Sequence, residues 1–111
     1  VLDAAVSVVH GDTDAVPWDI GAFASHTTYL VGSATRMAAA EARSGILKRA
    51  AEKLQTTVEA LDIVEGRIFL RTNPDQGLTV AEAMGPARGI PAANILGRGT
   101  YEPTKSFQKQ Y

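Results

Sequence analysis

One long helical pattern limits the folds that this chain can adopt. From Thr27 to Leu54, apolar or small side chains recur every three or four residues, which is the spacing of one face of an α-helix. That face consists of Leu30, Ser33, Met37, Ala40, Ser44, Leu47, Ala51 and Leu54. A helix of this length takes up about a quarter of the 111 residues. The remaining elements are therefore expected to pack against it.

The helical face is rich in small side chains, which let another backbone come close. Gly32 and Gly45 lie inside the same segment, although a glycine in a helix interior costs about 1 kcal/mol relative to alanine. Close packing against a neighbour is the expected reason for both glycines. An isolated fragment that exposed this face could self-associate.

Short elements are predicted on either side of the long helix. The segment Ala4–Asp12 (AAVSVVHGD) is typical of a short buried strand that ends in a Gly-Asp turn, and a loop follows it. After the helix, a turn or short helix leads into a hairpin of about residues 61–71. Its strands are Asp62–Val64 and Arg67–Arg71, joined by Glu65-Gly66.

The last third of the chain alternates loops with short elements. NPDQG (residues 73–77) is expected to be a loop, and Thr79 with Glu82 forms a capping-box pattern that predicts a short helix. NILGRGTYEP (94–103) is expected to be a last strand, with Gly97–Gly99 as a turn, and about 103–111 is expected to be a tail. The predicted class is α+β, in the order strand, loop, one long helix, β-hairpin, short helix, strand.

Composition excludes several classes of protein. The net charge is −1, so bulk charge gives no indication of a nucleic-acid partner. The absence of cysteine excludes disulfides and iron–sulfur ligation within this chain and fits a cytoplasmic protein. No apolar run approaches a membrane span. Because the chain begins at Val1 and leaves sheet edges unpaired, residues 1–111 are expected to be a single partial domain of a larger protein.

Catalytic and metal-binding patterns are weak. Ser25 and His26 are adjacent, so their side chains point apart in regular backbone and make a poor catalytic pair. Asp12, Asp14 and Asp19 do not match the spacing of a calcium loop. We therefore expect no catalytic residue and no metal ligand set in this chain.

The segment GAFASHTT (residues 21–28) has the composition of an anion site. It lies where the long helix begins, and the first N–H groups of a helix have no partner within it. The helix dipole favours negative charge there, and Ser25, Thr27 and Thr28 add hydroxyl donors. The residues alone leave two alternatives open. In the first, Ser25 or Thr27 is only the N-cap of the helix, which stabilises the helix by about 1 kcal/mol. In the second, the segment holds a ligand.

The same region resembles the molybdopterin-binding region in the large subunit of xanthine dehydrogenase/aldehyde oxidase-type molybdenum hydroxylases. Within that family it is most similar to the α subunit of 4-hydroxybenzoyl-CoA reductase. LDIVEGRIFL, LTVAEAM and ILGRGTYEP resemble the family's following hairpin, short helix and strand. The residues that match the family pattern are Gly11-Asp12-Thr13, Pro17, Gly21, Ala24-Ser25, Thr28 and Gly32-Ser33-Ala34.

The resemblance implies a cofactor and its binding residues. The family binds molybdenum with a pterin, usually as molybdopterin cytosine dinucleotide in bacteria. By the resemblance, the backbone and hydroxyls of Phe23, Ala24, Ser25, Thr27 and Thr28 would bind that cofactor. The family commonly has arginine where this chain has His26. A histidine would bind a phosphate or a neighbouring segment more weakly than an arginine does.

The resemblance also implies a larger enzyme. Its partners would be the rest of the molybdenum-binding subunit and subunits or domains that carry iron–sulfur clusters and FAD. The parent would oxidise or reductively dehydroxylate aromatic or heteroaromatic substrates. The family's general-base glutamate lies in a later segment, so the isolated chain is expected to be inactive. Two other hypotheses remain at this stage: a stand-alone phosphate- or nucleotide-binding module, and a purely structural or interaction domain.

Overall fold

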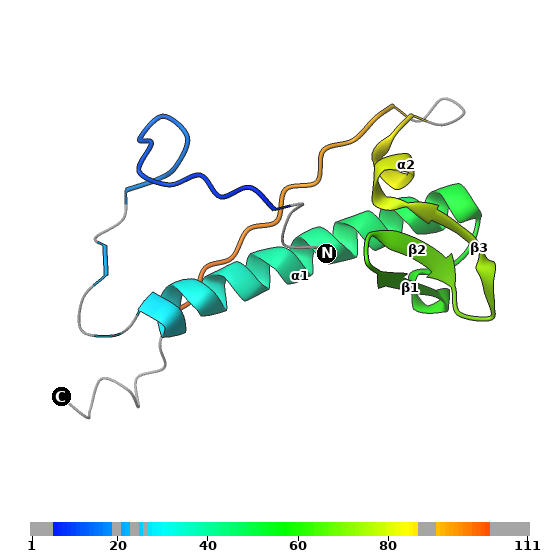
Figure 1. Cartoon of the computed structure of the whole chain (residues 1–111), viewed down its shortest axis with the longest axis horizontal. Helices are drawn as coiled ribbons and strands as arrows, with labels where there is room; N and C mark the ends of the chain where they lie inside the picture. Colours follow the sequence, from blue (N-terminus) through cyan, green and yellow to red (C-terminus); the bar gives the residue numbers. More distant parts are fainter. Residues whose placement is uncertain (1–5, 19–20, 23–24, 26, 87–90, 103–111) are drawn as a thin grey trace.

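The computed structural model describes residues 6–18, 21–22, 25, 27–86 and 91–102. It has dimensions of 54 × 33 × 25 Å. One long helix runs through it, and a small antiparallel sheet and a second helix gather at the C-terminal end of the long helix (Figure 1). The predicted α+β class is confirmed. The elements are α1 (Thr27–Leu54), the 3-10 turn η2 (Val58–Ala60), β1 (Leu61–Val64), β2 (Arg67–Leu70), β3 (Asn73–Thr79) and α2 (Val80–Met84).

Helix α1 has the predicted bounds, and a backbone motif ends it. Gln55 adopts a left-handed φ of 54°. The N–H of Gln55 then bonds to the carbonyl of Glu52, and the N–H of Thr56 bonds to the carbonyl of Ala51. This is the Schellman arrangement, which satisfies carbonyls that the helix itself leaves unpaired. Asparagine or glycine is usual at the left-handed position, so a glutamine there does not predict this motif.

The predicted hairpin is confirmed. Strands β1 and β2 pair antiparallel, with Leu61 opposite Leu70 and Val64 opposite Arg67. Glu65 and Gly66 have φ values of 48° and 79°. A two-residue loop of type I′ requires positive φ at both central positions, and this turn twists the strands in the favoured sense.

The segment 73–77, expected to be a loop, instead begins strand β3. This strand pairs antiparallel with β2, with Leu78 opposite Ile68 and Gly77 opposite Phe69. The prediction was wrong because proline, aspartate and glycine are rare in strands. Here β3 is an edge strand, where a proline is tolerated. A Cβ at Gly77 would lie 2.3 Å from the carbonyl oxygen of Ile68, so glycine allows the two strands to approach closely.

The core lies where the sheet and α2 meet the C-terminal half of α1. Its buried side chains are Leu47, Ala50, Ala51, Leu61, Ile68 and Ala83. Helix α2 begins with the predicted capping box: the N–H of Glu82 donates to the Thr79 hydroxyl, and the N–H of Thr79 donates to the Glu82 carboxylate.

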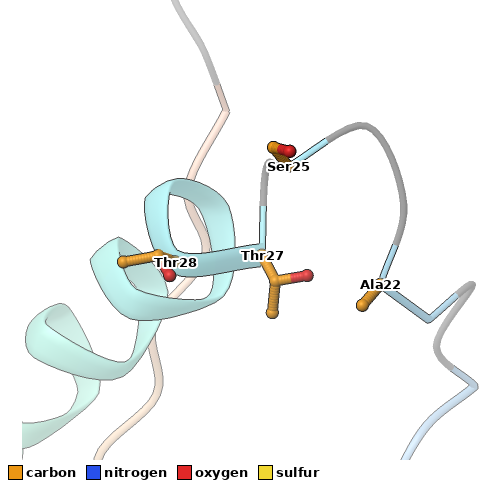
Figure 2. Close-up of a pocket in the computed structure, with 4 residues that line it drawn as sticks. All are labelled: Ala22, Ser25, Thr27 and Thr28. Carbon is orange, nitrogen blue, oxygen red and sulfur yellow. The ribbon is translucent and has the colours of Figure 1, made fainter.

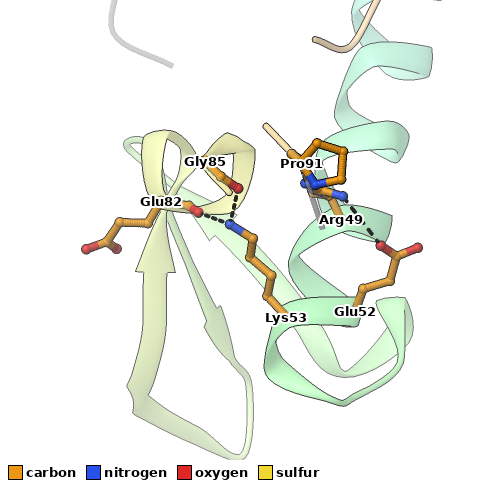
Figure 3. Close-up of polar contacts among 6 residues, drawn as sticks. All are labelled: Arg49, Glu52, Lys53, Glu82, Gly85 and Pro91. Atoms are coloured by element: carbon orange, nitrogen blue, oxygen red, sulfur yellow. Dashed lines mark hydrogen bonds and ion pairs between the residues drawn. The ribbon is translucent and has the colours of Figure 1, made fainter. Parts of the chain in front are cut away.

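A polar cluster ties α1 to the elements around the core (Figure 3). The Lys53 ammonium donates to the carbonyls of Glu82 and Gly85, at the C-terminal end of α2. Arg49 donates to the carbonyl of Pro91 and lies 4.0 Å from Glu52. These cations therefore stabilise the fold, because they donate hydrogen bonds to carbonyls that α2 and the following segment leave unpaired.

The predicted face of α1 is only partly correct. Leu47 and Ala51 are buried, and Leu54, Leu30 and Ser33 are half-buried. Met37, Ala40 and Ser44 are exposed. The difference arises because an extended segment covers the N-terminal half of α1. This segment lies over a different row of small residues than the predicted face.

That neighbour is residues 91–102, here called the strap (Figure 1, orange). The sequence predicted a strand for 94–103 and a turn at Gly97–Gly99, and both predictions were wrong for the described residues. The strap is extended, but its partner is a helix, whose backbone N–H and C=O groups are not free to pair with a strand. A Cβ at Gly97 would lie 2.0 Å from the Ala38 carbonyl oxygen, and one at Gly99 would lie 1.8 Å from that of Ala34.

Contact with the strap explains one of the two helix glycines. A Cβ at Gly45 would lie 2.7 Å from the Ile95 side chain, whereas one at Gly32 would meet none of the described residues within 4 Å. The close-packing explanation therefore holds for Gly45, and the described residues do not extend it to Gly32.

The first described residues form no strand. Residues 6–10 are irregular, and Val6, Val8 and Val9 are exposed, which corrects the strand expected there. The strand prediction fails in this structure because residues 6–10 have no strand partner among the described residues. The predicted turn is present: the N–H of Asp14 donates to the Asp12 carboxylate, and the N–H groups of Ala15 and Val16 donate to the Asp12 carbonyl. Residues 4–5 and the tail 103–111 lie outside the described residues.

Candidate functional site

The candidate site is the loop that leads into α1 (Figure 2). Two of its described residues have left-handed backbone: Gly21 with φ of 85° and Ser25 with φ of 55°. Glycine adopts this conformation freely, whereas serine rarely does. The two positions bend the chain sharply, so that Ala22 and Thr27 face the space between the loop and the helix start.

This space is an open hollow of about 340 Å³. Its lining residues are Ala22, Ser25, Thr27 and Thr28. Three of the five residues predicted to bind the cofactor, namely Ser25, Thr27 and Thr28, are thus brought together. The other two, Phe23 and Ala24, lie outside the described residues, as does His26.

The hollow favours an anionic or oxygen-rich ligand. The N–H groups in the first turn of a helix lack intrahelical partners and carry the positive end of the helix dipole. The first turn of α1 has no acidic residue that would compete with a ligand. The hydroxyls of Ser25 and Thr27 bond to no other described side chain or backbone group, so the described part of the chain offers no support for either as an N-cap.

The described groups around the hollow can hold a ligand, and these described groups include no acid, base or thiol. The described lining is one methyl side chain and three hydroxyl side chains. In the described ranges, no three histidine, aspartate or glutamate side chains lie close enough to hold a metal ion. Small side chains and hydrogen-bond donors of this kind fit the phosphate and oxygen atoms of the pterin cofactor that the resemblance implies.

A second hollow, of about 380 Å³, lies between α1 and β1. It is lined by Ala39, Ala42, Arg43, Ile46 and Ile63. The Arg43 guanidinium already faces the Asp62 carboxylate at 3.7 Å. The remaining lining side chains are apolar, so this hollow suits an anion less well than the hollow at the start of α1.

The strap ends beside the candidate site, and sequence reasoning missed this contact. The hydroxyl oxygens of Tyr29 and Tyr101 lie 2.5 Å apart, and the rings meet edge-to-face with centroids 5.2 Å apart. The hydrogen bond with Tyr29 raises the pKa of Tyr101 above its ordinary 10.0. The only sequence signal was the alternation of Gly97, Gly99 and Tyr101, which places all three on one side of an extended segment.

No helix in the described part of the chain is long and apolar enough to cross a membrane.

Comparison with known proteins places this geometry in a family. The family described as "Molybdopterin cofactor-binding domain" matches residues 3–111. The xanthine dehydrogenase molybdenum-binding subunit of Escherichia coli O157:H7 is 37% identical over 67 residues, which cover 60% of this chain and 9% of that protein.

Two solved structures share the fold. One is the Cu,Mo-CO dehydrogenase in its carbon monoxide reduced state, with a TM-score of 0.68 at 23% identity. The other is the reconstituted CO dehydrogenase from Oligotropha carboxidovorans, with a TM-score of 0.69 at 23% identity. Each match covers 83% of this chain and 12% of the other.

The chain spans about a tenth of the length of these relatives. The family match covers nearly all of its residues, and the fold agrees with it. This chain therefore belongs to the molybdopterin cofactor-binding domain family.

Proposed function

We propose that this chain forms part of the cofactor cradle in the molybdenum-binding subunit of a molybdenum hydroxylase. One observation carries the proposal: in a chain of this family, hydroxyl and small side chains gather in a hollow at the start of the longest helix. The helix start supplies unpaired N–H groups, and the hollow holds no competing carboxylate among its described lining residues.

The residues that we propose to hold the cofactor are Phe23, Ala24, Ser25, Thr27 and Thr28. Ser25 and Thr27 would donate hydroxyl hydrogen bonds, and the backbone of Phe23 and Ala24 would approach closely because Ala24 is small. We propose molybdopterin cytosine dinucleotide as the form bound. When bound, the cofactor supplies the redox chemistry, and these residues fix its position and orientation.

The parent enzyme is proposed to oxidise or reductively dehydroxylate an aromatic or heteroaromatic substrate. Its reaction type would be that of xanthine dehydrogenase or 4-hydroxybenzoyl-CoA reductase. Iron–sulfur and FAD-carrying subunits or domains are proposed as its partners, and the cytoplasm as its location. The matched relatives are about ten times longer than this chain, so the proposal assigns activity to the parent protein, within which residues 1–111 are one partial domain.

Substitutions in the hollow test the role of the hydroxyls. In the full-length protein, Thr27→Val and Thr28→Val each remove a hydroxyl with little change of shape. Thr35→Val is the matched control, because the Thr35 hydroxyl lies on the same helix and, among the described residues, bonds to the Val31 carbonyl alone. Molybdenum and pterin per chain are measured by elemental analysis and fluorescence of the released pterin. A hydrogen bond to a charged group contributes about 1.5–3 kcal/mol, so each variant should lose cofactor while the control retains it.

Ser25 needs a different pair of variants, because its φ is positive. Ser25→Gly removes the hydroxyl and keeps the backbone conformation, whereas Ser25→Pro forbids that conformation, since proline fixes φ near −65°. We expect partial loss of molybdenum in Ser25→Gly and complete loss in Ser25→Pro. Normal molybdenum content in the Ser25→Pro protein and in both threonine variants would refute the cradle. In that case, binding of cytidine diphosphate without molybdenum would indicate the stand-alone anion module instead.

A further inference from the structure

The strap lies along α1 in a regular register. Ile95 lies against Gly45, Gly97 against Ala38 and Ala42, and Gly99 against Ala34. Every second strap residue thus meets a helix position about four residues closer to the N-terminus. Two extended residues advance about 6.6 Å, and four helical residues advance about 6 Å. The two spacings nearly agree, so the register can continue along the helix.

The register reaches the turn that carries the candidate site. Two residues beyond Gly99, the Tyr101 ring meets Tyr29 edge-to-face, and the two hydroxyls are within hydrogen-bond distance. Tyr29 directly follows Thr27 and Thr28, which line the hollow. The strap is also fixed midway, because the N–H of Arg98 donates to the Glu41 carboxylate at 2.6 Å.

We propose that Tyr29 and Tyr101 are positioning residues, whose contact holds the first turn of α1 in the geometry that the cofactor needs. The inference rests on the proposed function, since it assigns the contact a role in cofactor retention. The physical reason is that the first turn of a helix frays: its N–H groups have no intrahelical partner, and its residues gain the fewest backbone bonds. An aromatic and hydrogen-bonded contact on Tyr29 restrains that turn from outside.

The experiment uses the full-length protein with Tyr101→Ala, which removes ring and hydroxyl, and Tyr101→Phe, which removes the hydroxyl alone. Leu96→Ala is the control, because Leu96 belongs to the strap but is 70% exposed. The first measurement is amide hydrogen exchange of residues 31–33 in cofactor-free protein, because the N–H groups of these residues bond to the first-turn carbonyls. The second measurement is the rate at which cofactor-loaded protein loses molybdenum.

We expect both rates to rise by about 5- to 150-fold in Tyr101→Ala, which is the effect of losing one neutral hydrogen bond and one aromatic pair. Tyr101→Phe should lie between wild type and Tyr101→Ala, and Leu96→Ala should match wild type. Unchanged exchange in Tyr101→Ala would overturn the proposal, as would faster exchange without faster molybdenum loss. A different result would contradict the proposed cofactor cradle itself, namely normal molybdenum content in the Thr27→Val and Thr28→Val proteins.

Discussion

Replacing Gly99 with alanine should detach the strap from α1. An added Cβ would lie 1.8 Å from the Ala34 carbonyl oxygen and 2.8 Å from the Ala38 nitrogen. Both are backbone atoms inside a helix, so neither can move aside cheaply. The strap must therefore shift outward, which weakens the bond between the Arg98 N–H and the Glu41 carboxylate.

The expected cost follows from the size of the clash. Overpacking by one methyl group in a tightly packed site costs about 1–3 kcal/mol, which corresponds to local opening that is about 5- to 150-fold more frequent. Hydrogen exchange at the Arg98 amide in the full-length protein measures this opening directly, because that N–H is bonded to Glu41 only while the strap is seated.

Gly32→Ala is the matched control for Gly99→Ala. Its Cβ meets no described atom within 4 Å, and alanine is the better helix former by about 1 kcal/mol. Exchange at Arg98 should therefore be unchanged or slower in this variant. Wild-type exchange in Gly99→Ala, or equal acceleration in Gly32→Ala, would refute the close approach of the strap to the helix.

Three further predictions concern the core, the second helix and the tyrosine pair. Ile68→Ala truncates a fully buried side chain and should lower the free energy of unfolding, measured by denaturant titration, by about 2–5 kcal/mol, whereas Val64→Ala at an exposed position should cost far less. Thr79→Ala should lower the free energy of unfolding by about 0.5–2 kcal/mol through loss of the capping box. Thr79→Ser should retain most of that stability when thermal unfolding is measured. The hydrogen bond with Tyr29 favours protonated Tyr101 in the folded state and raises its pKa. The stability from this contact should thus be present below a pH of about 10 and be lost as the pH rises through the raised pKa. An ultraviolet titration in which Tyr29→Phe leaves the Tyr101 pKa unchanged would contradict this.

Local patterns in the sequence were enough to predict α1, the hairpin and α2. The bounds of α1, the Glu65-Gly66 turn and the Thr79 capping box each depend on residues close together in the chain. Strand β3 was missed because its composition resembles a loop, and its pairing with β2 depends on Gly77 allowing close approach.

The strap was missed because its partner is distant in sequence. Periodicity shows that Gly97 and Gly99 share one side of an extended segment, but not that a helix more than fifty residues earlier lies against it. The same contact changed the face that α1 buries in its N-terminal half. At the site, the positions of Ser25, Thr27 and Thr28 followed from the helix start, whereas the approach of Tyr101 required the strap.

We propose that the parent of this chain carries a molybdenum–pterin cofactor in the cradle to which these residues belong. The molybdenum and cytidine nucleotide content of the full-length natural protein, measured by elemental analysis and by chromatography after acid release, tests this proposal. We expect close to one molybdenum and one cytidine nucleotide per chain. A folded full-length protein, produced in cells that make the cofactor, that contains neither would contradict it.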